Sequence, residues 1–327
     1  MASIKDTSLG VMGLEDSEKI WEIEKEWNNL LTKIPNSHPF MTPYWIGVTF
    51  DLYGVIHDGK IYALEVDREL AGIALLDVDM ENKRGKTLSP RYPHYFNEFI
   101  AYHEIREEFV EEILSALDVF IITQIPESSP YYWIMKKLAE NKKYSINITG
   151  QRNLKSLIIP ENVEKWLYKI KGKASRIITS TLKRAKRFEE IETKRIEDVS
   201  ELVDRLVFLF NNSSHSKSSI LEFKTFVENL AYLMVPQGIL KLIELVVEGW
   251  TLASILALEY RDRAYLLELS SITHIKDFDA SIYLLFKYIE YLSNMGFKEL
   301  FFFPPTSTMD FINFKNIKLL DITITTG

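Results

Sequence analysis

Apolar and polar residues alternate along the chain in an order that occurs twice. In the first half, two short alternating segments are typical of a hairpin, and a helical pattern and an apolar strand follow them. The same order returns about 180 residues later. The first set spans residues 61–67, 70–78, 104–117 and 119–125, and the second spans residues 240–247, 251–260, 281–295 and 297–303. Matched positions barely agree in residue type, so the pattern predicts two copies of one fold.

Further helices and strands are predicted between the repeated elements. The helices fall at residues 18–33, 129–141, 163–170, 175–190, 198–210 and 222–234, and the strands at residues 95–100, 144–149, 153–159 and 264–271. Asp279 and Gly296 bound the helix at 281–295, because one suits an N-cap and the other a left-handed stop. Antiparallel strands followed by a helix and a returning strand predict an α/β (α+β) fold. Each domain is then a mixed, mostly antiparallel sheet flanked by helices.

The expected domain boundary lies near residues 150–160, because Pro160 ends the apolar run at 153–159. We predict a flexible leader at residues 1–17, an N-terminal domain at residues 18–155 and a C-terminal domain at residues 156–327. The length of 327 residues, 46% of them hydrophobic, is enough for two domains with a core each.

Composition narrows the possible chemistry. The chain has no apolar run of about 18 residues and begins without the pattern of a signal peptide, so we expect a soluble, cytoplasmic protein with no membrane span. It has no cysteine, which excludes disulfides, thiolate metal sites and cysteine nucleophiles. No two of its six histidines have the helical spacing of metal ligands, and we therefore predict no metal.

Positive charge is concentrated in one segment, although the net charge is -7. Residues 169–187 carry eight basic side chains and no acidic one: Lys169, Lys171, Lys173, Arg176, Lys183, Arg184, Lys186 and Arg187. Such a run is often a solvated helix face. The functional interpretation is a site for an anionic partner such as CoA phosphates, an anionic sugar or lipid, or tRNA, with Lys183, Arg184 and Arg187 as candidate substrate-binding residues.

Three local motifs, taken in order, resemble the GNAT acyltransferase family. They are the entry segment at residues 37–45 (Ser-His-Pro-Phe-Met-Thr-Pro-Tyr-Trp), the basic helix at 182–187 and the small-residue helix start at 279–285. Together with the doubling they resemble the tandem, Fem-related branch, in particular BioF2-like or CelD-like acetyltransferases. The resemblance implies an N-acyltransferase that takes an acyl group from acetyl-CoA or another acyl-CoA, passes it to an amine, and holds its ligands in a cleft between the two domains.

The resemblance also implies where the donor's phosphates would bind. The segment at residues 272–281 stands in the place of the family's glycine-rich phosphate loop, but it contains no glycine. Lys276, Ala280 and Ser281, with the free N–H groups of the helix start, are the candidate cofactor-binding residues.

Acyl transfer to an amine needs a base, and two carboxylates in apolar strands are candidates. Glu268 lies in the apolar run Tyr-Leu-Leu-Glu-Leu at residues 265–269, and Glu98 lies in the matching strand of the first half. The alternative for each is a solvated or ion-paired side chain. Tyr95 and Asn97 are candidate substrate-binding residues beside Glu98, and the alternative for Tyr95 is packing.

Two other functions remain open. The basic run at 169–187 would suit a Fem-type transferase that takes its aminoacyl group from tRNA, although no long charged helical hairpin is predicted. The missing glycines and the segment Phe-Phe-Phe-Pro-Pro at residues 301–305 favour a degenerate GNAT fold that binds without catalysis. The acceptor, a small or anionic molecule, and the oligomeric state are not predicted further.

Overall fold

The chain folds into two compact units in a computed structural model. One unit comprises Met1–Asn153 with Ile317–Gly327, and the other comprises Leu154–Asn316. The structure describes residues 9–12, 18–54, 59–67, 69–88, 96, 98–141, 144–170, 173–212, 217–272, 275, 278–303 and 314–326.

The first unit is built on a sheet whose strands follow the order β1-β2-β3-β4-β6-β13-β7, with β5 paired to β3. The strands are β1 (Leu9–Met12), β2 (Gly59–Val66), β3 (Glu69–Asp79), β4 (Arg84–Thr87), β5 (Ile100–Ala101), β6 (Val119–Pro126), the first part of β7 (Tyr144–Ile158), and β13 (Lys315–Thr326). The pair β4–β6 is parallel, and β1–β2, β2–β3, β3–β4, β3–β5 and β6–β13 are antiparallel. The segment predicted as a leader thus contains one strand, β1, paired with β2.

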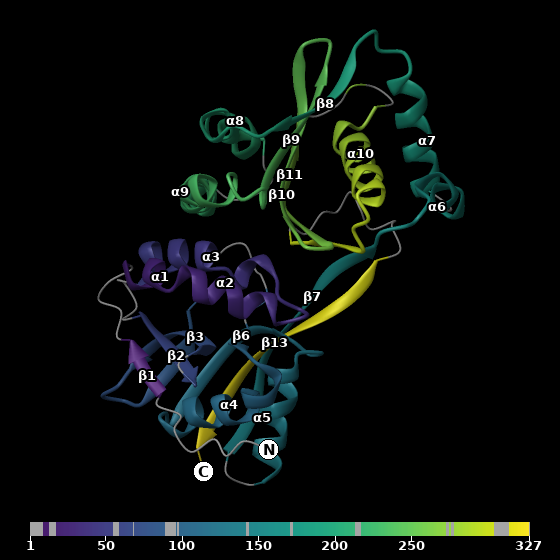
Figure 1. The fold of residues 1–327 in the computed structure, drawn as a ribbon. Coiled ribbons are helices and arrows are strands. Elements are labelled where there is room, and N and C mark those ends of the chain that lie inside the picture. Colours follow the sequence, from purple (N-terminus) through teal and green to yellow (C-terminus); the bar gives the residue numbers. More distant parts are fainter. Residues whose placement is uncertain are drawn as a thin grey trace. The chain divides into compact units, whose positions relative to one another are not determined.

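Helices cover both faces of this sheet (Figure 1). On one face lie α1 (Glu18–Glu22), α2 (Glu24–Thr32) and α3 (Pro43–Thr49), and on the other lie α4 (Arg106–Ser115) and α5 (Pro130–Glu140). Thr42 caps α3, because its side chain accepts a hydrogen bond from the Trp45 N–H at 3.3 Å. The aromatic residues Phe99, Phe109 and Phe120 are buried at the centre of the core under α4 and α5.

The second unit repeats this plan with the strand order β7-β12-β11-β10-β9-β8. Its strands are the end of β7 with β8 (Ile191–Ile196), β9 (Leu240–Val247), β10 (Trp250–Tyr260), β11 (Arg263–Ser271) and β12 (Glu299–Phe302). The pair β11–β12 is parallel and the others are antiparallel. Its helices are α6 (Val163–Lys169), α7 (Lys173–Ala185), α8 (Val199–Asn211), α9 (Lys217–Met234) and α10 (Ala280–Asn294). Figure 1 shows α8 and α9 on one face of the sheet and α10 on the other.

The repeated order and the mixed, mostly antiparallel sheets flanked by helices are therefore confirmed. In each unit a helix, α4 or α10, precedes the strand that pairs in parallel with an earlier one. The local signals at α10 hold: the Asp279 carboxylate accepts a hydrogen bond from the Ile282 N–H at 3.0 Å, and Gly296 has a φ of 80°. Of the strand predicted at residues 95–100, the described residues before Ile100 are not in a strand, and β5 begins at Ile100. The helix predicted at 175–190 ends at Ala185.

The first sheet takes in a strand from a distant stretch of sequence, and β7 contributes to both sheets. β13, at the end of the chain, lies between β6 and β7 in the first unit, whereas Lys155 to Ile158 of β7 pair with β12 in the second. Asp321 anchors β13, because its carboxylate accepts a hydrogen bond from the Gln124 N–H at 2.9 Å. Gln124 has a φ of 61°, unusual for a residue other than glycine, so this contact holds a strained turn of β6.

Candidate active site

In the second unit, the pairing of β11 with β12 ends at Leu266, just before the candidate residue Glu268. β12 pairs with β11 from Arg263 to Leu266, and the Phe303 N–H donates a last bond to the Leu266 carbonyl at 3.1 Å. β11 continues to Ser271, and in the described part of the chain β12 does not follow it. Among the described residues, the far half of β11 thus has an open edge on the side of β12. Unpaired backbone groups beside a crossover helix are suited to binding a ligand.

Glu268 lies at this point, and a β-bulge determines its direction. Leu256 of β10 is opposite Glu268, but the next residue, Ala257, is opposite Leu266, so Leu267 is the extra residue. The bulge turns Glu268 to the face that Leu256 shares, away from the core that packs against α10. Glu268 is 1% exposed. A carboxylate predicted from an apolar run is therefore buried in the middle of the sheet.

The start of α10 is occupied by a side chain of its own sequence. The Asp279 carboxylate accepts hydrogen bonds from the Ile282 N–H and, at 2.6 Å, from the Ser281 hydroxyl. The Asp279 N–H in turn donates to the hydroxyl of Thr181 on α7 at 3.3 Å. Ala280 and Ser281 are both buried. A phosphate at this helix start would meet a carboxylate that already bonds two of the available donors.

A row of polar residues crosses the face of the sheet that carries Glu268. Glu244 of β9 is opposite Ser254 of β10, and Ser254 is opposite Ser270 of β11. Because Ser270 lies two residues after Glu268 on the same strand, both side chains point to one face. Glu244, Ser254 and Ser270 are at most 3% exposed. Three cross-strand neighbours thus extend a polar surface from Glu268 across the sheet.

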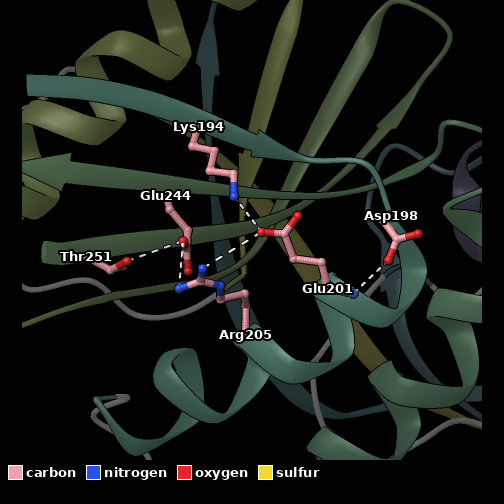
Figure 2. Close-up of polar contacts among 6 residues, drawn as sticks. All are labelled: Lys194, Asp198, Glu201, Arg205, Glu244 and Thr251. Carbon is pink, nitrogen blue, oxygen red and sulfur yellow. Dashed lines mark hydrogen bonds and ion pairs between the residues drawn. The ribbon is translucent and has the colours of Figure 1, made fainter. Parts of the chain in front are cut away.

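Figure 2 shows how α8 and β8 close the outer end of this row. The Arg205 guanidinium lies 3.8 Å from both Glu244 and Glu201, and Lys194 of β8 pairs with Glu201. The Thr251 hydroxyl donates to Glu244 at 3.3 Å. Burial raises the pKa of the Glu244 carboxyl, and the charge of Arg205 and the Thr251 hydrogen bond partly offset that rise.

Several atoms of the row have no hydrogen-bond partner among the described residues. They are Glu244 Oε1, Ser254 Oγ and Ser270 Oγ. Buried polar atoms are nearly always satisfied in folded proteins, and exceptions concentrate where a ligand or water binds. The face that carries Glu268 therefore has unused acceptors and donors next to the open edge of β11.

The basic segment forms one face of α7 and the turn after it. Ile178 and Thr181 are buried against α10, whereas Lys183 and Arg187 are exposed. Arg184 is half-buried and places its guanidinium 5.7 Å from the centre of the Phe188 ring. Across the residues that the structure describes, none forms an ion pair with these three cations. Their charge is thus available to an external anion.

A family model covers most of the second unit. Residues 172–311 match the model of the acetyltransferase (GNAT) domain family. The second unit therefore carries the match to the GNAT domain family. No curated protein matches the chain.

Solved structures extend the likeness of the GNAT domain to the whole chain. FemX has a TM-score of 0.62 at 12% identity, over 93% of this chain and 96% of FemX. A conserved protein of unknown function from Bacteroides thetaiotaomicron has a TM-score of 0.58 at 8% identity, over 98% of this chain and 99% of that protein. L-PGS from Bacillus licheniformis has a TM-score of 0.52 at 12% identity, over 95% of this chain and 92% of L-PGS. At these identities the likeness concerns the fold, and it confirms the resemblance to tandem, Fem-like GNAT proteins at that level.

The predicted site residues divide between the two units. Glu268, Ala280, Ser281, Lys183, Arg184 and Arg187 lie in the GNAT domain, and Glu98 lies in the first unit. Lys276, Tyr95 and Asn97 lie outside the described residues. Within the described residues, no three metal-ligating side chains form a group, and no helix is both long and apolar enough to span a bilayer.

Sequence reasoning missed the polar row and one residue of the first unit. A glutamate inside the apolar strand at 240–247 was the available signal for Glu244. His38 belongs to the entry segment, yet it lies 3.5 Å from Glu98, a residue far away in the sequence. The neighbours of these side chains come from other strands and helices, which a local pattern does not specify.

Proposed function

We propose that the chain is an N-acyltransferase that moves an acyl group from acyl-CoA to an amine in its GNAT domain. The observation that carries the proposal is Glu268, a buried carboxylate turned by a bulge to the polar face beside the open edge of β11. A base in this setting is what deprotonation of an acceptor amine requires. We assign that role to Glu268.

The reaction proceeds through a tetrahedral intermediate. The amine nitrogen attacks the thioester carbonyl and forms a C–N bond, while Glu268 takes the amine proton. Collapse breaks the C–S bond, and the CoA thiolate leaves and is protonated. Negative charge on the carbonyl oxygen is stabilised by N–H donors placed in advance. Backbone N–H groups of β11 beyond Leu266 are the donors we assign, because β12 does not pair with this part of the strand.

The acceptor amine would contact the polar row rather than the apolar core. Ser270 and Ser254 offer hydroxyl groups without partners among the described residues, and Glu244 offers a carboxylate oxygen. These groups suit an acceptor that carries hydroxyl or amino substituents. For the donor, we retain Lys276, Ala280 and Ser281 as the phosphate-binding residues. The cations of α7 are close in sequence to Thr181, whose hydroxyl accepts a hydrogen bond from the Asp279 N–H.

Two measurements test this function. Acetyl-CoA and longer acyl-CoAs are titrated into the protein by calorimetry, and we expect saturable heat. Thiol release is then followed with a thiol-reactive dye in the presence of a panel of amines, and the absence of cysteine means that the protein gives no background. If no acyl-CoA gives heat and none changes the melting temperature, the proposal is removed. Binding without amine-dependent thiol release would instead favour a degenerate GNAT fold that only binds.

A second function, aminoacyl transfer from tRNA, is favoured by the exposed cations of α7 and by the fold shared with FemX. We expect tRNA binding that weakens steeply with salt under this alternative. Reversing Lys183, Arg184 and Arg187 to glutamate should then reduce binding, whereas the matched reversal of the exposed cations Lys83, Arg84 and Lys86 should not. Equal loss in both triple variants, or no binding at all, contradicts it.

A further inference from the structure

A small cavity inside the first unit brings together polar groups that the proposed acyl transfer does not use. Its volume is about 20 Å³, which is room for roughly one water-sized group. Its wall is mostly aromatic and aliphatic, and three polar side chains reach it: His38, Thr87 and Glu98. Of the described residues that line it, none is a lysine or an arginine.

His38 is buried there, with a side chain that is 4% exposed. Among the described residues, neither of its ring nitrogens has a hydrogen-bond partner. The rings of Phe40 and Phe96 pack against it with centroids at 5.5 Å, which fixes the imidazole in the wall. Buried polar groups are rarely left unsatisfied because doing so is costly, so an imidazole held in this way is an unused binding group.

Glu98 supplies negative charge at the same place. Its Oε2 lies 3.5 Å from His38 Nε2, and its side chain is 13% exposed. The charge of Glu98 is also felt by the buried hydroxyl of Tyr131, whose pKa is raised chiefly by burial and further by this carboxylate. A carboxylate in an aromatic wall attracts a cation, because the ring faces are themselves negative.

The third group is the hydroxyl of Thr87, which is 2% exposed. Among the described residues, its oxygen accepts one hydrogen bond, from the Thr123 N–H at 3.3 Å. A hydroxyl oxygen has two lone pairs, so it retains one for a second donor. The cavity therefore presents three acceptors: a carboxylate oxygen, a hydroxyl oxygen and, in the neutral imidazole, a ring nitrogen.

We infer that this cavity binds the ammonium group of a small primary amine. An ammonium group has three N–H donors and no acceptor, which matches the three acceptors in the cavity wall, and it is close to a water molecule in size. The inference goes beyond the proposed function, because it concerns the first unit and holds whether or not the GNAT domain transfers an acyl group.

Methylammonium is the probe that tests this site on the unmodified protein. Methylammonium chloride is titrated at pH 8 against sodium chloride of equal ionic strength, and the ¹⁵N shifts of the His38 ring are followed by NMR. We expect a saturable shift with methylammonium and none with tetramethylammonium, which is larger and has no N–H. No saturable shift, or the same shift with tetramethylammonium or sodium, overturns the inference.

Variants then identify the carboxylate. Glu98→Gln keeps the shape and removes the charge, and we expect it to raise the dissociation constant for methylammonium at least about tenfold, since charge-assisted hydrogen bonds are the stronger kind. Glu108→Gln, an exposed glutamate of the same unit, is the matched control and should leave it unchanged. Equal affinity in Glu98→Gln and the wild type overturns the assignment. If Glu98→Gln does not fold, Thr87→Val replaces it, and an unchanged constant there is equally contradictory.

Discussion

The two units contain the same order of elements but treat the third strand of the meander differently. In the GNAT domain it is the unbroken nine-residue β11, with Glu268 buried beyond the last pair to β12. In the first unit its place is divided between β4, of four residues, and β5, of two. Glu98 lies just before β5, and its side chain lines a small cavity together with His38. A shared topology thus places a carboxylate in a comparable region twice, while the local backbone decides what surrounds it.

The largest expected difference between the units is catalytic. Under the proposed function, Glu268→Gln should lower kcat/KM for amine acylation by about 10²- to 10⁴-fold, because it removes the general base and keeps the shape. Affinity for acyl-CoA, measured by calorimetry, should be retained. Glu189→Gln, an exposed glutamate of the same domain, is the control. A loss of less than threefold for Glu268→Gln would show that the base lies elsewhere.

The next effect tests where β13 belongs. Phe109→Ala removes a fully buried ring from the core of the first unit and should cost about 3–5 kcal/mol in the free energy of unfolding, measured with urea. Hydrogen exchange should show the lost protection in β6 and β13 together, with β10 and β11 less affected. Met80→Ala, at a residue 54% exposed, should change stability by under about 0.5 kcal/mol. If the hydrogen-exchange protection of β13 in Phe109→Ala changes in step with that of β11 rather than that of β6, the place of β13 in the first unit is contradicted.

A smaller effect concerns the start of α10. Asp279→Asn keeps a capping side chain and removes the negative charge, so acyl-CoA should bind about two- to fivefold more tightly if its phosphates approach this helix. Calorimetry on the variant and the wild type gives the ratio. Weaker binding would mean that the carboxylate helps to shape the donor site, and an unchanged constant would place the phosphates away from α10.

The smallest effect is a pH dependence in the polar row. Burial raises the pKa of Glu244 in the folded state, so the fold binds a proton more readily there than the unfolded chain does. Stability from this group is therefore present below its unfolded pKa and declines as pH rises toward the raised value. Glu244→Gln should flatten that decline in urea titrations at several pH values. A variant whose stability falls with pH as steeply as the wild type would contradict the assignment.

Sequence predicted best what is decided locally. The helix α10 was located by a cap at Asp279 and a stop at Gly296, and both signals act within a few residues. The strand β8 was not predicted, because its sequence Ile-Glu-Thr-Lys-Arg-Ile carries four polar residues at the edge of a sheet. β13 was not predicted either, and no local pattern specifies that the last strand pairs with β6.

The same distinction explains the site. Glu268 was a candidate because a charge inside an apolar run is visible in the sequence, but the bulge that sets its direction depends on pairing with β10. The unsatisfied serines at 254 and 270 look like ordinary strand residues until the register places them opposite each other. His38 and Glu98 meet only after the first unit has folded, so their spacing in the chain carried no signal.

The position of β13 has a consequence for how the protein is made. The first 153 residues leave the ribosome before the strand that completes their sheet, so β6 and β7 have unpaired edges until β13 has been synthesised. Open edges of this kind pair readily with other chains, and protection of the nascent first unit is most needed during synthesis of the second. Loss of β13 would for the same reason destabilise the first unit.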